Sequence, residues 1–407
     1  MLATLIPLFN NQMQVRAYSL FSQKRNKLLQ PALLGSGQND GAVNVEGLEV
    51  IQSIGIDTLS PDADIFLPVG NIAVFSSLEA QCGVLVSRIT LLFDYSIVPE
   101  DSYVKRLKQL KEAGFKLAMY KLPIADFENY RAVLELMDYF ILDCKKTDVD
   151  KALFYFSRRF PNITLCAGNI DSQTQFDILR EKVGLELFEG NFYRLPVDLG
   201  NVELTPLKVN YLQLLELINA PDFDLQKVAD VIGRDTAMVV SLLEMVNKIS
   251  VNSEITSIRH AAAMLGQKEL RKWINTVITK ELCSERPSEI MRLSLLRAKF
   301  MELLAPMFEL RAKSSELFLT GLFSVLDLIL NLPLAEALDR INISKEIRQA
   351  LLQNQGELAE VYHMLLCYEN ADWQEISRQM IIMNQSDNMV YQAYIESVKW
   401  YRNLFFK

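Results

Sequence analysis

Features that would point to a secreted, membrane-bound or nucleic-acid-binding protein are scarce in this sequence. Its 407 residues include only five cysteines, an odd number, scattered along the chain and without a CxxC pair. This spacing favours buried thiols in a reducing compartment over a disulfide framework or a cysteine metal site. The five are Cys82, Cys144, Cys166, Cys283 and Cys367.

Long apolar runs and an amino-terminal targeting signal are also missing. The most apolar stretch, GLFSVLDLILNL, is interrupted by Asp327 and falls short of a membrane span. The first residues, MLATLIPLFNNQ, lack the basic segment of a signal peptide. We therefore expect a cytoplasmic protein with no membrane contact. The net charge of −8 argues against nucleic acid as a partner, because binding to phosphates requires basic surface.

The composition and the order of patterns indicate a protein of two folded domains. Apolar residues make up 50% and charged residues 23% of a chain long enough for two or three separate cores. Strand-like and helical patterns alternate up to about residue 200, and from ELTPLK at Pro206 onward the pattern is helical throughout. We expect a first domain at 1–200, a second at 201–407, and the boundary within 197–208.

The amino-terminal domain has the pattern of parallel βα units. Strand-like runs such as VRAYSLF, FKLAMYKL, DYFILDC and ITLCAGNI alternate with helical runs such as SYVKRLKQLKEAG, which ends at Gly114. Alternation of this kind predicts a parallel sheet. Because it recurs so often, it favours a TIM-like (β/α) barrel over an open sheet.

The stretch from Asp224 to Ile278 predicts four consecutive helices. Gly233 ends the first, and Asp235 or Thr236 caps the second by accepting a bond from its free N–H groups. Gly266 stands where a left-handed residue ends the third. The fourth has its own apolar face, made of Leu270, Trp273, Ile274, Val277 and Ile278.

These helices resemble an HDOD domain, a relative of the HD-type hydrolases that lacks their metal site. The likeness is carried by the Asp235 turn, the LLEMVNK run with Asn247, the ITSI segment and the AAAMLG helix end at Gly266. We interpret Asn247 as structural, because a buried amide at a helix end can join loop backbone groups. HD enzymes hold metal with several histidines and an adjacent His-Asp pair. Only His260 and His363 are present, neither followed by Asp, so we interpret both as helix-surface or packing residues.

The first 200 residues are similar to an EAL domain, the barrel that hydrolyses cyclic di-GMP in bacterial signalling. The matching runs are LKQLKEAGFKLAM, DYFILD and FEGNFYRLP. As a whole the chain resembles the EAL–HDOD signalling proteins of the YuxH-like family, and the likeness extends to YENADW and YIESVKWYRNLF near the carboxyl terminus. The resemblance implies a multidomain α/β and all-α protein: a TIM-like barrel of EAL type, then an all-helical HDOD domain.

The resemblance also implies a cluster of carboxylates at the ends of the barrel strands, and this chain departs from it. The corresponding positions here are Ser19, Pro68, Tyr120, Lys121, Asp143, Gly168, Asp171 and Glu189. Lys121 puts a cation where a metal ion would lie, and the three remaining acids are too few for a site with two octahedral metals. We expect Asp143 and Asp171 to cap loops or pair with neighbouring charges, and Glu189 to belong to a turn at Gly190.

We therefore predict a non-catalytic signalling protein, without metal or cofactor, that acts through protein–protein interaction with other signalling proteins. The family resemblance implies control of motility, biofilm formation or related cyclic di-GMP-linked behaviour. The alternative is a cyclic di-GMP receptor that binds the nucleotide without hydrolysing it. We do not expect this binding, because the lost positions also remove metal-linked contacts. The sequence leaves the partner and the oligomeric state open, a homo-oligomer included.

One surface stands out as a candidate for partner binding. Lys268, Arg271 and Lys272 are expected on the side of the fourth helix opposite its apolar face, with Asn275 at the border. They would form a short basic strip on an acidic protein. The alternative is an ordinary solvated helix face, since surface charges usually contribute little.

Overall fold

The computed structural model describes residues 1–23, 45–194, 206–220, 223–233, 235–249, 255, 257–283, 288–341 and 343–405. Among these residues, no helix combines the length and the apolar character needed to span a bilayer. The chain divides into two compact units. The first comprises Met1–Leu195 together with Leu366–Lys407, and the second is Pro196–Leu365.

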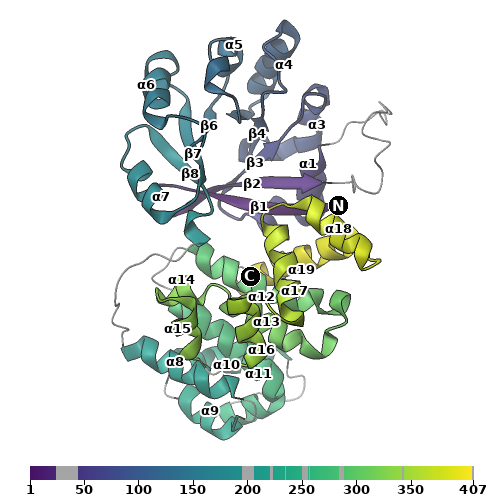
Figure 1. The fold of residues 1–407 in the computed structure, drawn as a ribbon. Helices are drawn as coiled ribbons and strands as arrows, with labels where there is room; N and C mark the ends of the chain where they lie inside the picture. The colour runs from purple at the N-terminus through teal and green to yellow at the C-terminus, as the bar shows by residue number, and fades with distance from the viewer. Residues whose placement is uncertain are drawn as a thin grey trace. The chain divides into compact units, whose positions relative to one another are not determined.

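The first unit is built on a closed barrel of eight strands (Figure 1). Strands β2 to β8 run parallel, whereas β1 is antiparallel to both of its neighbours, β2 and β8. The barrel predicted from strand–helix alternation is therefore confirmed. The strands are β1 Leu2–Phe9, β2 Val15–Gln23, β3 Asp64–Pro68, β4 Ile89–Phe93, β5 Lys116–Tyr120, β6 Tyr139–Asp143, β7 Thr164–Ile170 and β8 Leu185–Gly190.

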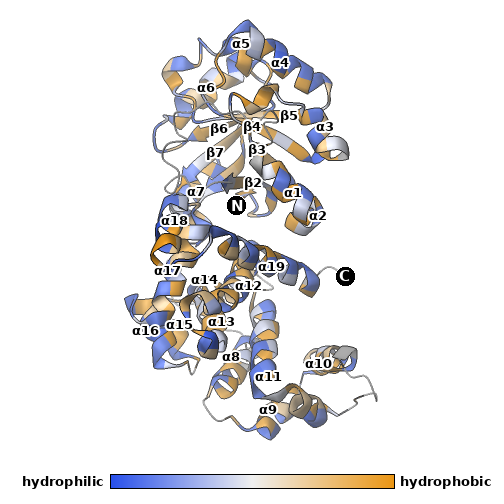
Figure 2. Cartoon of the chain, turned by 90° about the vertical axis from the view of Figure 1, so that its right-hand side faces the viewer, coloured by the Kyte–Doolittle hydropathy of each residue, from blue (hydrophilic) through white to orange (hydrophobic). Residues whose placement is uncertain are grey.

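Helices connect the parallel strands and turn polar faces outward, as the mixed blue and orange of α4 to α6 shows in Figure 2. At the end of α4 the chain turns at Gly114, whose φ of +96° suits a residue without a Cβ atom. The connecting helices are α1 Glu46–Ile54, α2 Ile56–Leu59, α3 Leu78–Cys82, α4 Asp101–Glu112, α5 Arg131–Leu134, α6 Val149–Arg159 and α7 Gln173–Arg180.

Each strand contributes one buried residue to a common core inside the barrel. Successive side chains of a strand point to opposite faces, so this core also fixes which other positions face inward. Its members are Leu8, Ala17, Phe66, Leu92, Ala118, Ile141, Cys166 and Leu187. Tyr120 and Tyr139 pack against it.

Strand β1 is the barrel element that the sequence analysis missed. Its residues, LATLIPLF, form a nearly continuous buried run without alternation. On the β8 side only Leu8 and Phe9 are paired, opposite Glu189 and Phe188. Among the described strands, the first part of β1 thus has a neighbour on one side only, an edge that proteins usually cover.

The carboxyl-terminal segment packs against this part of the barrel. Helix α19, Asp387–Phe405, lies on β1 and on α2. The Tyr368 side chain is fully buried, and its hydroxyl accepts a hydrogen bond from the Ala3 N–H of β1 at 3.3 Å. The Tyr368 ring contacts Trp373 and Tyr394, with centroids 5.3 and 5.0 Å away. The segment therefore belongs to the barrel unit, whereas we had expected all of 201–407 to form the second domain.

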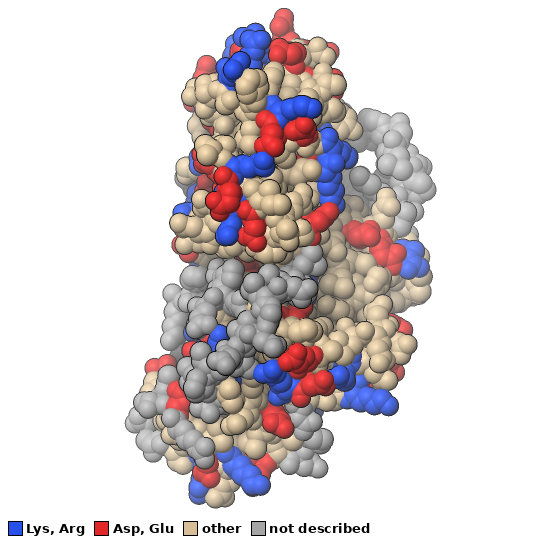
Figure 3. Space-filling model, turned by 60° about the vertical axis from the view of Figure 1, so that its left-hand side comes forward, with Lys and Arg blue, Asp and Glu red and all other residues tan. Residues whose placement is uncertain are grey.

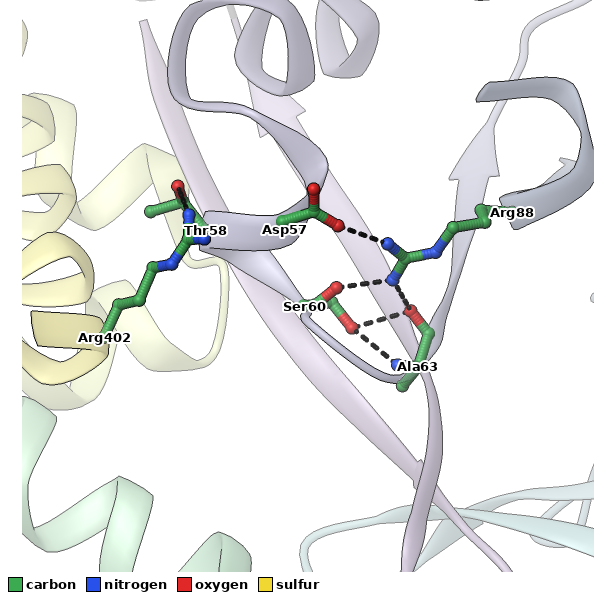
Figure 4. Close-up of polar contacts among 6 residues, drawn as sticks. All are labelled: Asp57, Thr58, Ser60, Ala63, Arg88 and Arg402. Carbon is green, nitrogen blue, oxygen red and sulfur yellow. Dashed lines mark hydrogen bonds and ion pairs between the residues drawn. The ribbon is translucent and has the colours of Figure 1, made fainter. Parts of the chain in front are cut away.

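Polar contacts tie the same segment to the barrel unit. Arg402 of α19 donates a hydrogen bond to the Thr58 hydroxyl of α2 (Figure 4). Beside it, Arg88 donates to the Asp57 carboxylate at 2.7 Å and to the Ala63 carbonyl at 3.0 Å, which fixes the loop between α2 and β3. The last helices are α17 Glu357–Glu369, α18 Trp373–Ile382 and α19.

The second unit is helical throughout its described residues, in agreement with the prediction. Helix α11 is interrupted at Gly266, whose φ of +73° and ψ of 169° are not helical, so the chain passes through the four helical segments expected between Asp224 and Ile278. The helices are α8 Pro206–Asn219, α9 Leu225–Ile232, α10 Thr236–Ile249, α11 Ile258–Leu282, α12 Ser288–Leu304, α13 Ser314–Phe323, α14 Leu326–Leu330, α15 Leu334–Asp339 and α16 Lys345–Gln353.

The packing of Tyr368 predicts that the carboxyl-terminal segment stabilises the barrel. Tyr368→Ala removes a fully buried ring and the acceptor for Ala3, so we expect a loss of about 3–5 kcal/mol in the free energy of unfolding. Ile382→Ala, at a position 68% exposed in the same segment, is the control and should cost less than about 0.5 kcal/mol. Urea denaturation measures both. Equal, small losses for the two variants would show that the segment does not support the barrel.

Candidate functional site

The carboxyl-terminal mouth of the barrel gathers most of the positions singled out from the EAL resemblance. Side chains two residues apart on a strand lie on the same face of the sheet. In β2 to β8, the residue two positions after each core residue therefore also faces the inside of the barrel. On this basis the inner positions at the mouth are Ser19, Pro68, Asp94, Tyr120, Asp143, Gly168 and Glu189. Lys121 directly follows β5, and Asp171 directly follows β7.

Asp94 is the member of this layer that the sequence reasoning overlooked. It follows β4 and stands two residues after the core residue Leu92, the same spacing as at the other strands. This two-residue spacing could have identified Asp94 as a residue of the mouth. The Asp94 carboxylate accepts a hydrogen bond from the Ser96 N–H at 2.9 Å, so it also shapes the loop after β4.

Glu189 and Lys121 form the electrostatic centre of the mouth. Burial raises the pKa of the Glu189 carboxyl above its ordinary value, the Lys121 ammonium opposes this rise, and the Asp143 carboxylate adds to it. Lys121 has a φ of +57°, a left-handed conformation that is costly for a residue with a Cβ atom. The Lys121 side chain itself is exposed, and its charge acts on the Glu189 carboxyl.

Tyr120 fills the space beside this cation. Burial, with a smaller contribution from Asp94, raises the pKa of Tyr120 to about 12, so its phenol is neutral at physiological pH. The Lys121 Nζ atom lies 4.8 Å from the centroid of the Tyr120 ring, within the range of a cation–π contact. The pair lies at the end of β5, with Tyr120 half-buried and Lys121 exposed.

Gly168 leaves no room for the carboxylate that the EAL resemblance implies at that position. A Cβ atom built on Gly168 would lie 2.8 Å from Ile141 Cγ2, 3.3 Å from the Leu142 carbonyl oxygen and 3.4 Å from Glu189 Oε2. The carboxylate of Glu189 leans over Gly168 instead. A larger residue at 168 therefore requires movement of Ile141, a member of the barrel core.

Asp143 and Asp171, the two aspartates singled out from the sequence, also have partners of their own. Asp143 Oδ1 accepts a hydrogen bond from the Lys145 N–H at 3.0 Å, and its other oxygen lies 3.9 Å from the Lys146 ammonium. Asp171 pairs with the Lys145 ammonium at 2.9 Å, with both side chains more than half exposed. These contacts cap a loop and form surface ion pairs, which typically contribute up to about 1 kcal/mol each.

The residues at the mouth do not fit a pair of divalent metal ions. Such a site needs a set of carboxylate oxygens arranged around each ion. Among the described residues, no three His, Cys, Asp or Glu side chains are grouped so that they could hold a metal. Lys121 adds a repelling charge, and Gly168 and Ser19 supply no carboxylate.

Three residues of the helical unit hold its local structure. The Asp235 carboxylate accepts a hydrogen bond from the Met238 N–H at the start of α10 and another from the Tyr211 hydroxyl, both at 3.2 Å. The Asn247 amide makes two bonds with one residue of the following loop: it donates to the Ile255 carbonyl at 3.0 Å and accepts from the Ile255 N–H at 2.7 Å. Gly266 breaks α11.

The basic strip expected on α11 does not form a free surface. The Arg271 guanidinium donates to the carbonyls of Ile218 and Ala220, at 3.0 and 3.1 Å, where α8 ends. Lys272 binds the Glu302 carboxylate. Asn275 is fully buried, and of the strip only Lys268 is exposed. The expectation that these side chains face solvent was wrong for Arg271, Lys272 and Asn275. Arg271 and Lys272 bind carbonyl and carboxylate groups of neighbouring helices, and the Asn275 amide pairs with the Asn219 amide of α8.

Within the described part of the helical unit, His260, His363 and Asp327 are not grouped as metal ligands would be in an HD-type hydrolase. His260 and His363 are exposed on α11 and α17. Burial raises the pKa of the Asp327 carboxyl in α14, and the positive charge of Arg297 opposes the rise. Over the face in Figure 3, acidic and basic side chains of the described residues are interspersed rather than separated by sign.

Comparison with known proteins assigns the helical region. Residues 204–371 match the family model of the HDOD domain. The chain carries an HDOD domain. This match confirms the HDOD part of the resemblance noted in the sequence, and it ends at residue 371, close to where the second compact unit ends.

Two curated proteins are similar over most of the chain. The uncharacterized protein YuxH of Bacillus subtilis is 27% identical over 98% of this chain and 97% of its own length. The cyclic di-GMP phosphodiesterase CdgJ of Vibrio cholerae is 25% identical over 75% of this chain and 71% of its own length. The YuxH-like organisation expected from the sequence is thus confirmed.

Solved structures of EAL proteins are among those that this chain resembles. The Bacillus subtilis YkuI protein, which has an EAL domain and was solved with cyclic di-GMP and calcium, is 16% identical. The comparison covers 66% of this chain and 73% of YkuI, with a TM-score of 0.36.

The environment of Glu189 predicts a pH-dependent effect of its replacement. Because the folded-state pKa lies above the ordinary value of 4.5, the folded protein holds the proton over an interval in which the unfolded chain has lost it. The free energy of unfolding therefore falls as pH rises through that interval. Glu189→Gln should have a higher denaturation midpoint than the parent at pH 8. The difference should shrink as pH falls and be lost below about pH 3.5, where the Glu189 carboxyl is protonated in the folded and the unfolded chain.

The control for this prediction is Glu186→Gln, an exposed position on the same strand. Its difference from the parent should not follow the same pH course. The Glu189→Gln midpoint minus the parent midpoint should fall as pH falls. If it stays constant or grows toward pH 4, the ionised form of Glu189 is not disfavoured at the mouth.

Proposed function

We propose that this chain is a non-catalytic signalling protein in which the barrel and the HDOD domain act by binding other proteins, within a cyclic di-GMP-linked pathway. The observation that carries the proposal is the Lys121 ammonium beside Glu189 at the carboxyl-terminal mouth. In TIM barrels this is the face where catalytic groups collect. A fixed cation there opposes the binding of the divalent metals that would activate water for phosphodiester cleavage.

Two further features support the absence of phosphodiesterase chemistry. Gly168 cannot be replaced by a carboxylate without displacing Ile141, so one acidic ligand is missing for steric reasons as well as by sequence. The remaining acids, Asp143 and Asp171, are engaged with Lys146 and Lys145. Cyclic di-GMP enters the proposal through CdgJ, a relative of this chain that is a cyclic di-GMP phosphodiesterase.

The alternative is a receptor that binds cyclic di-GMP without cleaving it. Three ammonium groups, those of Lys121, Lys145 and Lys146, lie at or beside the mouth, and ammonium groups bind phosphate. Against this reading, Lys145 already pairs with Asp171, and Lys121 lies over the Tyr120 ring. We therefore favour protein binding.

The proposal predicts no cleavage of cyclic di-GMP by the purified chain in Mg²⁺ or Mn²⁺, under conditions in which CdgJ is active as the positive control. Calorimetry should give a dissociation constant for cyclic di-GMP no tighter than about 100 µM, or roughly −5 to −6 kcal/mol. A submicromolar constant without turnover would establish the receptor instead. Turnover that Asp143→Asn or Glu189→Gln abolishes would refute the non-catalytic reading.

A further inference from the structure

A second cavity lies at the opposite end of the barrel, away from the carboxyl-terminal mouth. It has a volume of about 470 Å³, within the range of small-molecule sites. Its lining comes from the first residues of several strands, such as Asp64 of β3, Tyr139 of β6 and Thr164 of β7. Asn10 and Asn11 of the turn between β1 and β2 also line it.

The cavity combines an aromatic wall with polar groups that have no partner among the described residues. The Tyr139 ring stands edge-on against Phe66, with centroids 5.2 Å apart. The Tyr139 and Thr164 hydroxyls make no hydrogen bond within the described part of the protein. Burial raises the pKa of Tyr139, so the phenol keeps its proton and can donate.

Charges of both signs line the cavity. Asp64, a lining residue, forms an ion pair at 2.9 Å with Lys116, which lies outside the lining, so its charge is compensated. Arg16 of β2 and Glu186 of β8 are exposed lining residues, and within the described structure neither forms an ion pair. In the barrel, β1 alone separates their strands, so the strand axes are about 10 Å apart. A guanidinium and a carboxylate, each without an ion pair in the described structure, thus line the same cavity.

We propose that this cavity binds a free amino acid with an aromatic side chain. Arg16 receives the α-carboxylate, since guanidinium groups pair well with carboxylates. Glu186 receives the α-ammonium, because Asp64 is already engaged by Lys116. The side chain of the ligand packs against the half-buried Tyr139 ring, which Phe66 supports from the core, as aromatic rings do in offset or edge-on contacts. A ligand with only one of the two charges would leave Arg16 or Glu186 without its counterpart.

Calorimetry on the full chain with L-phenylalanine tests this assignment. We expect saturable binding, and a loss of at least tenfold in affinity for 2-phenylethylamine, which lacks the carboxylate, and for 3-phenylpropionate, which lacks the ammonium. Arg16→Gln should weaken L-phenylalanine at least tenfold and leave 2-phenylethylamine unchanged. Glu186→Gln should weaken L-phenylalanine likewise and leave 3-phenylpropionate unchanged.

Matched controls are available on α4, where Lys105 and Glu112 are exposed and lie outside the cavity. Lys105→Gln and Glu112→Gln make the same charge changes and should leave binding intact, and melting curves establish that every variant is folded. Absence of binding at millimolar L-phenylalanine would overturn the proposal. So would analogues that bind as tightly as the amino acid, or folded Arg16→Gln and Glu186→Gln variants with unchanged affinity.

Discussion

The charge of one ammonium group, that of Lys121, acts on the buried Glu189 carboxyl at the carboxyl-terminal mouth of the barrel. A divalent metal requires several oxygen ligands and a negative local field, whereas Lys121 supplies a positive charge on a left-handed backbone directly after β5. The same charge partly offsets the penalty of burying Glu189 beside Asp143. Tyr120, the preceding residue, is half-buried, and burial raises its pKa to about 12, so its ring stays neutral.

The barrel that holds this mouth depends on residues from both ends of the chain. Strand β1 closes the cylinder but is paired with β8 over only two residues. The carboxyl-terminal segment covers β1 through the buried Tyr368, and the ion pair between Arg194 and Glu369 adds a further link within the barrel unit. The HDOD region is accordingly flanked on both sides by segments of the barrel unit.

The strands β2 to β8 and the helical character of the second unit could be predicted, because strand–helix alternation and glycine or proline stops are local features of sequence. The mouth positions could be predicted from the EAL resemblance, because that resemblance points to the ends of the strands. Each mouth residue on a strand lies two positions after a core residue and so shares its inward direction. Asp94 obeys the same period and was missed because the resemblance did not point to it. Strand β1 was missed because its apolar run does not alternate with polar residues. One of its two neighbouring strands, β8, is also distant in sequence.

The basic strip on α11 shows a different limit of sequence reasoning. Arg271 and Lys272 read as surface charges from helical periodicity, but their long side chains reach carbonyls at the end of α8 and the Glu302 carboxylate. Such contacts join residues 30 or more apart in sequence. Periodicity gives the direction in which a side chain leaves the helix and does not say what its charged end meets.

Titration of Mn²⁺ into the purified chain, followed by the electron paramagnetic resonance signal of the free ion, tests the central claim most directly. A mouth in which Lys121 opposes metal binding predicts that the free-ion signal rises in proportion to added Mn²⁺ up to about 1 mM, equally in the parent and in Asp143→Asn. A dissociation constant above 1 mM corresponds to less than about 4 kcal/mol of binding. A stoichiometric loss of signal in the parent that disappears in Asp143→Asn would show a functional metal site and contradict the account.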